Sequence, residues 1–158
     1  MKVIFLMFLI IGMSSCASSS RVLDGATVAD VKGQNLEQWN HLIGRWHGSN
    51  PIINGGTHSW LIDRFANGTY LIKFKSIHAD GSIREGFEAG DWGSSGDIYF
   101  QIYRKYFKGE ETISSNPSSP ENYDAYYIIK LDESELEFKH ARTSYTFIEN
   151  KVGNDFKL

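Results

Sequence analysis

Residues 67–77 read Asn-Gly-Thr-Tyr-Leu-Ile-Lys-Phe-Lys-Ser-Ile, and this stretch decides the fold class. Asn-Gly between two apolar runs is a strong short-range signal for a two-residue β-hairpin turn. After the turn, Tyr70, Ile72 and Phe74 alternate with two lysines. This period-two pattern is typical of a strand with one buried face. The stretch therefore predicts a half-buried strand that follows a tight hairpin.

The same rhythm extends in both directions along the chain. Apolar alternation between turn signals predicts eight strands, at residues 45–49, 59–65, 69–77, 83–92, 98–106, 123–131, 135–140 and 144–150. A row of antiparallel strands has two unpaired edges, and closing the sheet removes both. We therefore expect an all-β fold, an eight-stranded antiparallel up-and-down barrel. A two-sheet sandwich is the alternative topology.

A short helix is expected before the first strand. Asn35 with Gln38 three residues later forms a capping-box pattern. Apolar residues then recur at helical spacing through Leu42 and Ile43, which predicts two helical turns that end at Gly44. The longest segment without a strand pattern is 107–120, which contains two X-Pro pairs.

Composition limits the class of protein. The 158 residues suit about one domain. A formal net charge of −3 argues against a nucleic-acid partner, which normally requires a basic surface. Four Trp, eight Tyr and ten Phe argue against a disordered chain. A single cysteine excludes a disulfide framework within the chain and any multi-cysteine metal site.

The N-terminus has the pattern of a secretory signal peptide. Lys2 precedes an apolar run over residues 3–13, which is shorter than the ~20 residues that a spanning helix needs. Small residues follow, from Ser14 to Ala17. Ordinary cleavage after Ala17, with plain secretion, is one interpretation of this segment.

Residues 13–16, Met-Ser-Ser-Cys, resemble the lipobox of bacterial lipoproteins. This resemblance implies cleavage before Cys16, lipid attachment to Cys16 and anchoring of the protein to a membrane. No Asp follows the cysteine, and by resemblance to enterobacterial sorting this implies the outer membrane of a bacterial envelope, with the protein facing the periplasm. The expected organisation is a signal peptide at 1–15, a flexible tether at 16–33 and a barrel domain at 34–158.

Three segments of the predicted domain resemble the lipocalins and their bacterial lipocalin-like relatives. Residues 44–46, Gly-Arg-Trp, are similar to the Gly-x-Trp opening of that family, and residues 65–70 and 88–92 are similar to later strands of the bacterial relatives. In the family, the Trp closes one end of the barrel, often against a late Arg. The resemblance therefore implies that Trp46 and Arg142 close the barrel.

The lumen is the candidate binding site. Large residues in phase on the inner face are expected to line it, and the expected ligand-binding residues are Trp60, Tyr70, Phe74, Phe100, Tyr127, Phe138 and His140. An apolar lining with a few polar groups suits a small apolar or amphipathic ligand. A fully packed core without a cavity is the alternative.

The sequence has no strong catalytic motif, and an enzyme that acts through lumen acids or His140 is a further alternative. It has no Gly-x-Ser-x-Gly elbow and no zinc-protease spacing of histidines, so we assign no catalytic residue, metal or cofactor. One alternative is a resemblance to the haem-binding barrels of the nitrobindin type, which would make His140 the iron ligand. Another is an envelope interaction or inhibitor module that acts through loops 50–58 and 107–120.

Overall fold

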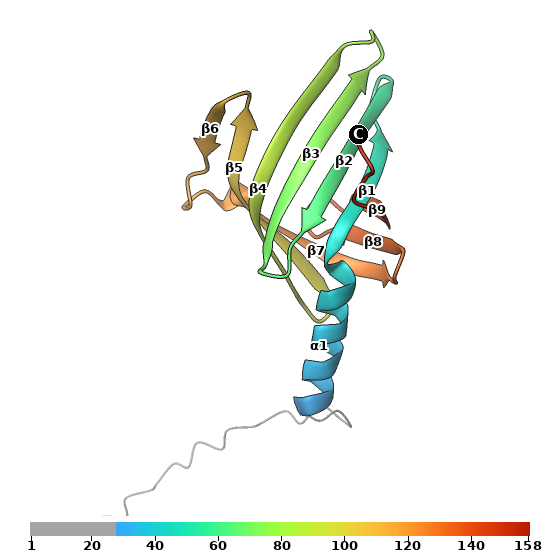
Figure 1. The fold of residues 1–158 in the computed structure, drawn as a ribbon, viewed down its shortest axis with the longest axis vertical. Helices are drawn as coiled ribbons and strands as arrows, with labels where there is room; N and C mark the ends of the chain where they lie inside the picture. The colour runs from blue at the N-terminus through green and yellow to red at the C-terminus, as the bar shows by residue number, and fades with distance from the viewer. Residues whose placement is uncertain (1–27) are drawn as a thin grey trace, which may run out of the picture.

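The computed structural model describes residues 28–158, and for residues 28–34 it describes the backbone alone (Figure 1). The predicted signal peptide, the lipid site at Cys16 and most of the predicted tether lie outside the described residues. In the described part, no helix combines the length and the apolar character needed to cross a bilayer.

One helix and nine strands make up the domain, together with a single 3-10 turn, η1 (Pro120–Asn122), in residues 28–158. In chain order they are α1 (Val28–Leu42), β1 (Gly44–Pro51), β2 (Gly56–Arg64), β3 (Thr69–His78), β4 (Ile83–Ser95), β5 (Ile98–Lys108), β6 (Glu111–Ser114), β7 (Tyr123–Leu131), β8 (Glu135–His140) and β9 (Thr146–Lys151). The eight predicted strands all form, with their ends within three residues of the expected positions.

The sheet closes on itself. Each strand pairs antiparallel with its neighbour, β4 also pairs with β5, and β1 pairs with β9. Eight strands therefore form an up-and-down barrel, as predicted, and the sandwich topology is wrong. β6 pairs with β5 alone and stands to one side of the barrel in Figure 1.

Both segments predicted as functional loops are more regular than expected. In 107–120, β5 continues to Lys108 and turns back as β6, so the first half of the segment is a hairpin. In 50–58, β1 and β2 run almost to the turn and leave only residues 52–55 outside the two strands. Ladder hydrogen bonds satisfy the backbone groups that an irregular loop would leave to water, which favours extension of both hairpins.

The helix is longer than predicted. α1 begins at Val28 rather than at Asn35, so the expected cap residue lies inside the helix and α1 takes in the last residues of segment 16–33. A glycine inside a helix costs only about 1 kcal/mol, so Gly33 does not stop it. At its other end, Trp39 stacks on Trp92 of β4 with ring centroids 4.2 Å apart, which fixes α1 against one end of the barrel.

Trp46 is buried where α1 meets β1, but the cation beside it differs from the prediction. The Trp46 side chain is 0% exposed and donates from Nε1 to the carbonyl of Leu42 at 3.0 Å. The cation over its ring is Lys151, with Nζ 5.0 Å from the centroid. Arg142 is 60% exposed and pairs with Glu121 instead. The prediction for Arg142 is wrong because β1 pairs with β9, and this places Trp46 directly opposite Lys151.

Candidate functional site

A cavity of about 190 Å³ lies in the lumen, so the alternative of a completely filled core is wrong. It is somewhat larger than a ~150 Å³ cavity that binds benzene, and smaller than the ~300 Å³ at which typical ligand pockets begin. The residues that line it are His58, Trp60, Ile72, Phe74, Glu88, Gln101, Asp124, Tyr126, Phe138, Phe147 and Glu149.

In three strands, the residues that face the lumen are those that the sequence predicted. Trp60 of β2, Phe74 of β3 and Phe138 of β8 line the cavity. Tyr70 and His140 are buried beside it, one against Glu88 and the other against Tyr126. These strands alternate cleanly between large apolar and polar residues, which makes their inner faces readable.

In β5 and β7, the prediction of which residues face the lumen is wrong. Tyr99 is 0% exposed and Gln101 lines the cavity, so the neighbouring Phe100 lies on the outer face. In the same way Tyr126 lines the cavity and Tyr127 is 52% exposed. Both strands carry large residues at consecutive positions, and a shift of one residue exchanges the two faces. Neither Phe100 nor Tyr127 is a lumen residue.

Aromatic rings form one wall of the cavity. Phe138 contacts Tyr126 edge to face at 5.1 Å and stacks on Phe147 at 5.4 Å. Trp60 meets Phe147 edge to face at 5.8 Å. Pairs of this geometry are worth about 0.5–1.5 kcal/mol beyond their buried area. The packed rings therefore give the cavity a preformed apolar wall.

A buried polar network lies beneath the cavity, and Trp60 and Glu149 connect it to the lining. Arg64 donates from Nη1 to Oε2 of Glu149 at 2.8 Å and from Nε to the hydroxyl of Tyr99 at 2.9 Å. Trp60 donates from Nε1 to the other Glu149 oxygen at 2.8 Å. Burial raises the pKa of Tyr99 to about 12, so its hydroxyl stays protonated. Both carboxylate oxygens of Glu149 are thus occupied by protein donors.

Glu88 is the acidic group on the opposite wall. Its Oε1 accepts a hydrogen bond from the Tyr70 hydroxyl at 2.5 Å. Burial raises the pKa of Glu88, the Tyr70 hydrogen bond lowers it, and the negative charge of Asp124 raises it further. Burial and the adjacent Glu88 also raise the pKa of Tyr70, which therefore remains a donor. Among the described residues, no donor is bonded to the second oxygen of Glu88, Oε2.

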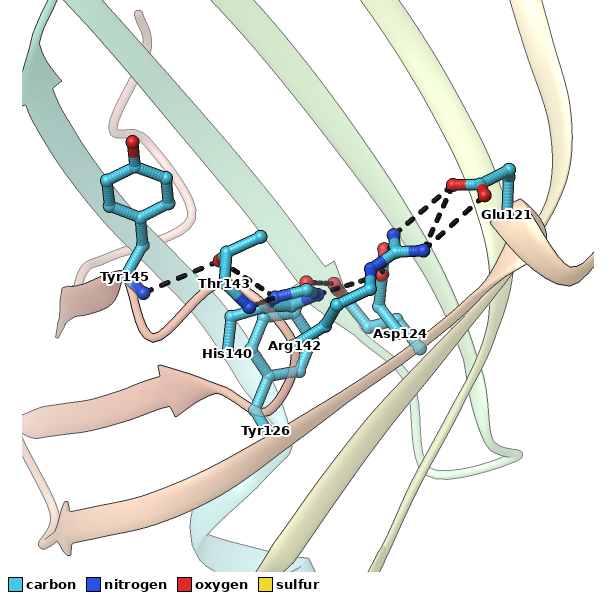
Figure 2. A network of polar contacts seen from close by, with 8 residues as sticks. Glu121, Asp124, Tyr126, His140, Arg142, Thr143 and Tyr145 are labelled. Atoms are coloured by element: carbon cyan, nitrogen blue, oxygen red, sulfur yellow. Dashed lines mark hydrogen bonds and ion pairs between the residues drawn. The ribbon is translucent and has the colours of Figure 1, made fainter.

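Asp124, which lines the cavity, is hydrogen bonded to His140 (Figure 2). Nδ1 of His140 accepts from the backbone N–H of Thr143 at 3.0 Å, so the ring proton must lie on Nε2. Nε2 then donates to Oδ1 of Asp124 at 3.0 Å. Arg142 reaches the same network, with Nη2 3.9 Å from Asp124 and 3.2 Å from Glu121.

This network contradicts the interpretation of His140 as a haem ligand. A ligating histidine needs one ring nitrogen free to face the iron, and both nitrogens of His140 are engaged by Thr143 and Asp124. Among the side chains that the structure describes, in residues 35–158, no group of three or more His, Cys, Asp or Glu is placed to hold a metal ion.

The polar half of the site was not predicted. Ile72 lines the cavity in the phase that the alternation of residues 70–74 predicted, and the lining residues that were not expected are His58, Glu88, Gln101, Asp124, Tyr126, Phe147 and Glu149. The inward position of Glu88 could have been predicted, since it lies four residues before Trp92 on the same face of a predicted strand. Glu149 has none, because a buried glutamate in sequence looks like any exposed one.

An up-and-down barrel of eight strands, with an N-terminal helix against one end and a small cavity in the lumen, has a lipocalin-like fold. No protein-family model and no curated protein matches this chain. Among solved structures, a lipocalin-like protein from Bacteroides uniformis is similar to it, with 16% identity and a TM-score of 0.42. The match covers 71% of this chain and 99% of that chain.

Proposed function

We propose that this protein is a lipoprotein that binds a small amphipathic molecule in its barrel lumen without covalent chemistry. The observation that supports this function is the cavity of about 190 Å³, which combines an aromatic wall with carboxylate and amide groups. Aromatic surface gives affinity to a small ligand, and a few convergent polar groups orient it. The proposed ligand is amphipathic because the lining has both kinds of surface.

Binding can be tested with 2-phenylethanol as the probe, measured by titration calorimetry and by chemical-shift changes. We expect saturable binding that is lost in Ile72→Phe, which fills the cavity from β3. Leu71→Phe is the matched control, since Leu71 is the adjacent residue on the outer face. Phe74→Trp is a second filling variant in case the first one does not fold. Binding that survives both filling variants would contradict the lumen as the site.

A natural ligand can be sought by native mass spectrometry. The full chain would be extracted from the envelope of the bacterium that expresses it and analysed without denaturation. We expect an adduct of low mass that Ile72→Phe removes. Repeated preparations that carry no adduct, together with no binding of 2-phenylethanol, would argue against the binding function.

We also propose that Cys16 carries the lipid anchor and holds the barrel on the periplasmic side of the outer membrane. The support is the short apolar segment followed by Ser-Ser-Cys. One acyl chain binds a membrane weakly, whereas two or more anchor a protein stably. Labelled palmitate should enter the wild-type protein and should not enter Cys16→Ala, which should leave the membrane fraction. A mature protein that begins after Ala17 would contradict the anchor.

An envelope interaction module is the second candidate. The β1–β2 turn and the β5–β6 hairpin both lie at the end of the barrel away from α1 (Figure 1). They expose Ile53 (82%) and Ile113 (43%), the kind of apolar surface that protein contacts use. A double variant, Ile53→Ser with Ile113→Ser, should then lose a partner that the wild type captures from envelope extracts. Equal capture by both proteins would remove this candidate.

A further inference from the structure

We infer that the lumen cavity selects a small organic ammonium ion, with an apolar body about the size of one aromatic ring. This inference rests on the proposed lumen-binding function and adds the charge of the ligand to it. The polar lining of the cavity includes the carboxylates of Glu88, Asp124 and Glu149, and no Lys or Arg side chain of the described residues lines it.

The first step is the position of Glu88. It extends from β4 into the cavity opposite the aromatic wall, and its Oε1 is held by the Tyr70 hydroxyl. Its Oε2 has no bonded donor among the described residues. A carboxylate fixed through one oxygen presents the other to a ligand in a defined direction. The complement of this group is a donor with a positive charge.

The second step is the charge balance. Of the described residues that line the cavity, none is Lys or Arg. The guanidinium of Arg64 beneath the cavity is paired with Glu149. Burial lowers the pKa of His58, so this ring is neutral at neutral pH. The negative charge of Glu88 therefore has no cation within the lining.

A second carboxylate in the lining, that of Asp124, adds negative charge beside Glu88. It accepts the hydrogen bond from His140 and has Arg142 at 3.9 Å, so its own charge is partly balanced. The mutual repulsion of Glu88 and Asp124 and the burial of Glu88 both oppose ionisation of Glu88. An ammonium ion between them would relieve both effects.

The third step is the shape and chemistry of the remaining wall. The rings of Trp60, Tyr126 and Phe138 offer faces and edges to an apolar ligand body. An ammonium group within about 6 Å of an aromatic face also gains cation–π attraction. A cavity of about 190 Å³ suits an apolar body of one ring with a short chain.

The test compares three probes of similar size and different charge at neutral pH, by titration calorimetry. These are phenethylammonium, the neutral 2-phenylethanol and the anionic phenylacetate. We expect phenethylammonium to bind roughly tenfold or more tightly than 2-phenylethanol, because hydrogen bonds between charged groups are the stronger ones. Phenylacetate should bind more weakly than 2-phenylethanol.

The variants assign the preference to Glu88. Glu88→Gln keeps an acceptor for Tyr70 and removes the charge, so phenethylammonium and 2-phenylethanol should bind about equally. Glu85→Gln is the matched control, since Glu85 is on the same strand but pairs with Lys73 and Lys75 on the outer face. The control should keep the full preference of the wild type.

The outcomes separate this inference from the function on which it rests. If no probe binds the wild-type protein, both fail. If 2-phenylethanol binds as tightly as phenethylammonium, or if phenylacetate binds best, the lumen function stands and the ammonium inference is overturned. The ranking in the wild type decides this even if Glu88→Gln does not fold.

Discussion

Arg64 and Glu149 form an ion pair beneath the lumen cavity, with 2.8 Å between Nη1 and Oε2 and side chains 0% and 2% exposed. The pair joins β2 to β9, which lie on either side of β1 in the closed sheet. Trp60 completes the hydrogen bonds of Glu149, while Nη2 of Arg64 is buried without a partner in the described part of the chain. A substitution of either residue is therefore expected to change both the stability of the barrel and the shape of the cavity.

We predict that Glu149→Leu lowers the free energy of unfolding by about 3–5 kcal/mol, because it leaves the Arg64 charge buried and unpaired. The double variant Arg64→Met with Glu149→Leu should recover most of that loss. Urea unfolding measures both. Arg142→Ala, which breaks an exposed pair, should cost less than about 1 kcal/mol. A single Glu149→Leu change as mild as this control would show that the pair is not structural.

The second prediction concerns the helix end of the barrel. Lys151 places Nζ over the Trp46 ring and donates to the carbonyl of His41 at 3.1 Å, in the last turn of α1. Lys151→Met should cost about 0.5–1 kcal/mol and speed amide hydrogen exchange in α1, because it removes the cation from both the ring and the helix C-terminus. Arg142→Met should leave exchange in α1 unchanged. If exchange in α1 became faster in Arg142→Met and not in Lys151→Met, Arg142 would be the partner of Trp46, as the resemblance implied.

Turns made the barrel predictable. Signals such as Asn67-Gly68 act locally, since Gly68 has a φ of +80° that few other residues adopt. Two such turns fix both ends of the strand between them, as they do for Thr69–His78. Up-and-down order follows because the connections are short. The hairpin of β5 with β6 also turns at a glycine, Gly109, whose φ is +64°, but the four exposed residues of β6 lack the alternation that predicts a strand.

The site was only half predictable. Alternation places Phe74 and Phe138 inside without knowledge of their neighbours, but in β5 the residues on both sides of Tyr99 are large and apolar. The inner face of that strand is settled by its register, in which Tyr99 lies opposite Tyr126. The polar lining of the cavity depends on contacts between distant strands, and these contacts cannot be inferred from a single sequence.

A third prediction concerns pH. Burial raises the pKa of Glu88 above its ordinary value of 4.5, so in the window just above that value the folded chain holds a proton that the unfolded chain releases. The free energy of unfolding therefore falls as the pH rises through this window. Glu88→Gln should remove that fall, measured by urea unfolding between about pH 4 and 8.

The difference between the wild type and Glu88→Gln isolates this effect. His58 acts in the opposite direction, since burial lowers its pKa and the unfolded chain binds the proton more tightly just below 6.5. Its contribution is common to both proteins and cancels in the difference. If the two pH profiles are parallel, Glu88 does not titrate as a buried group.

The last prediction concerns Gly48, which allows the Trp60 ring to lie flat against β1. A Cβ at this position would overlap Cζ2 of Trp60 and would lie 2.8 Å from the carbonyl oxygen of Ile148, so Gly48→Ala must displace the ring. Overpacking of this kind costs about 1–3 kcal/mol, and the displaced indole would lose its bond to Glu149 and enter the cavity. Urea unfolding, tryptophan fluorescence and binding of 2-phenylethanol should all change together. Gly81→Asn is the control, at a turn with φ +80° and open space, where asparagine is tolerated. If Gly48→Ala matched this control in all three measurements, Trp60 would not be the fixed wall on which the site depends.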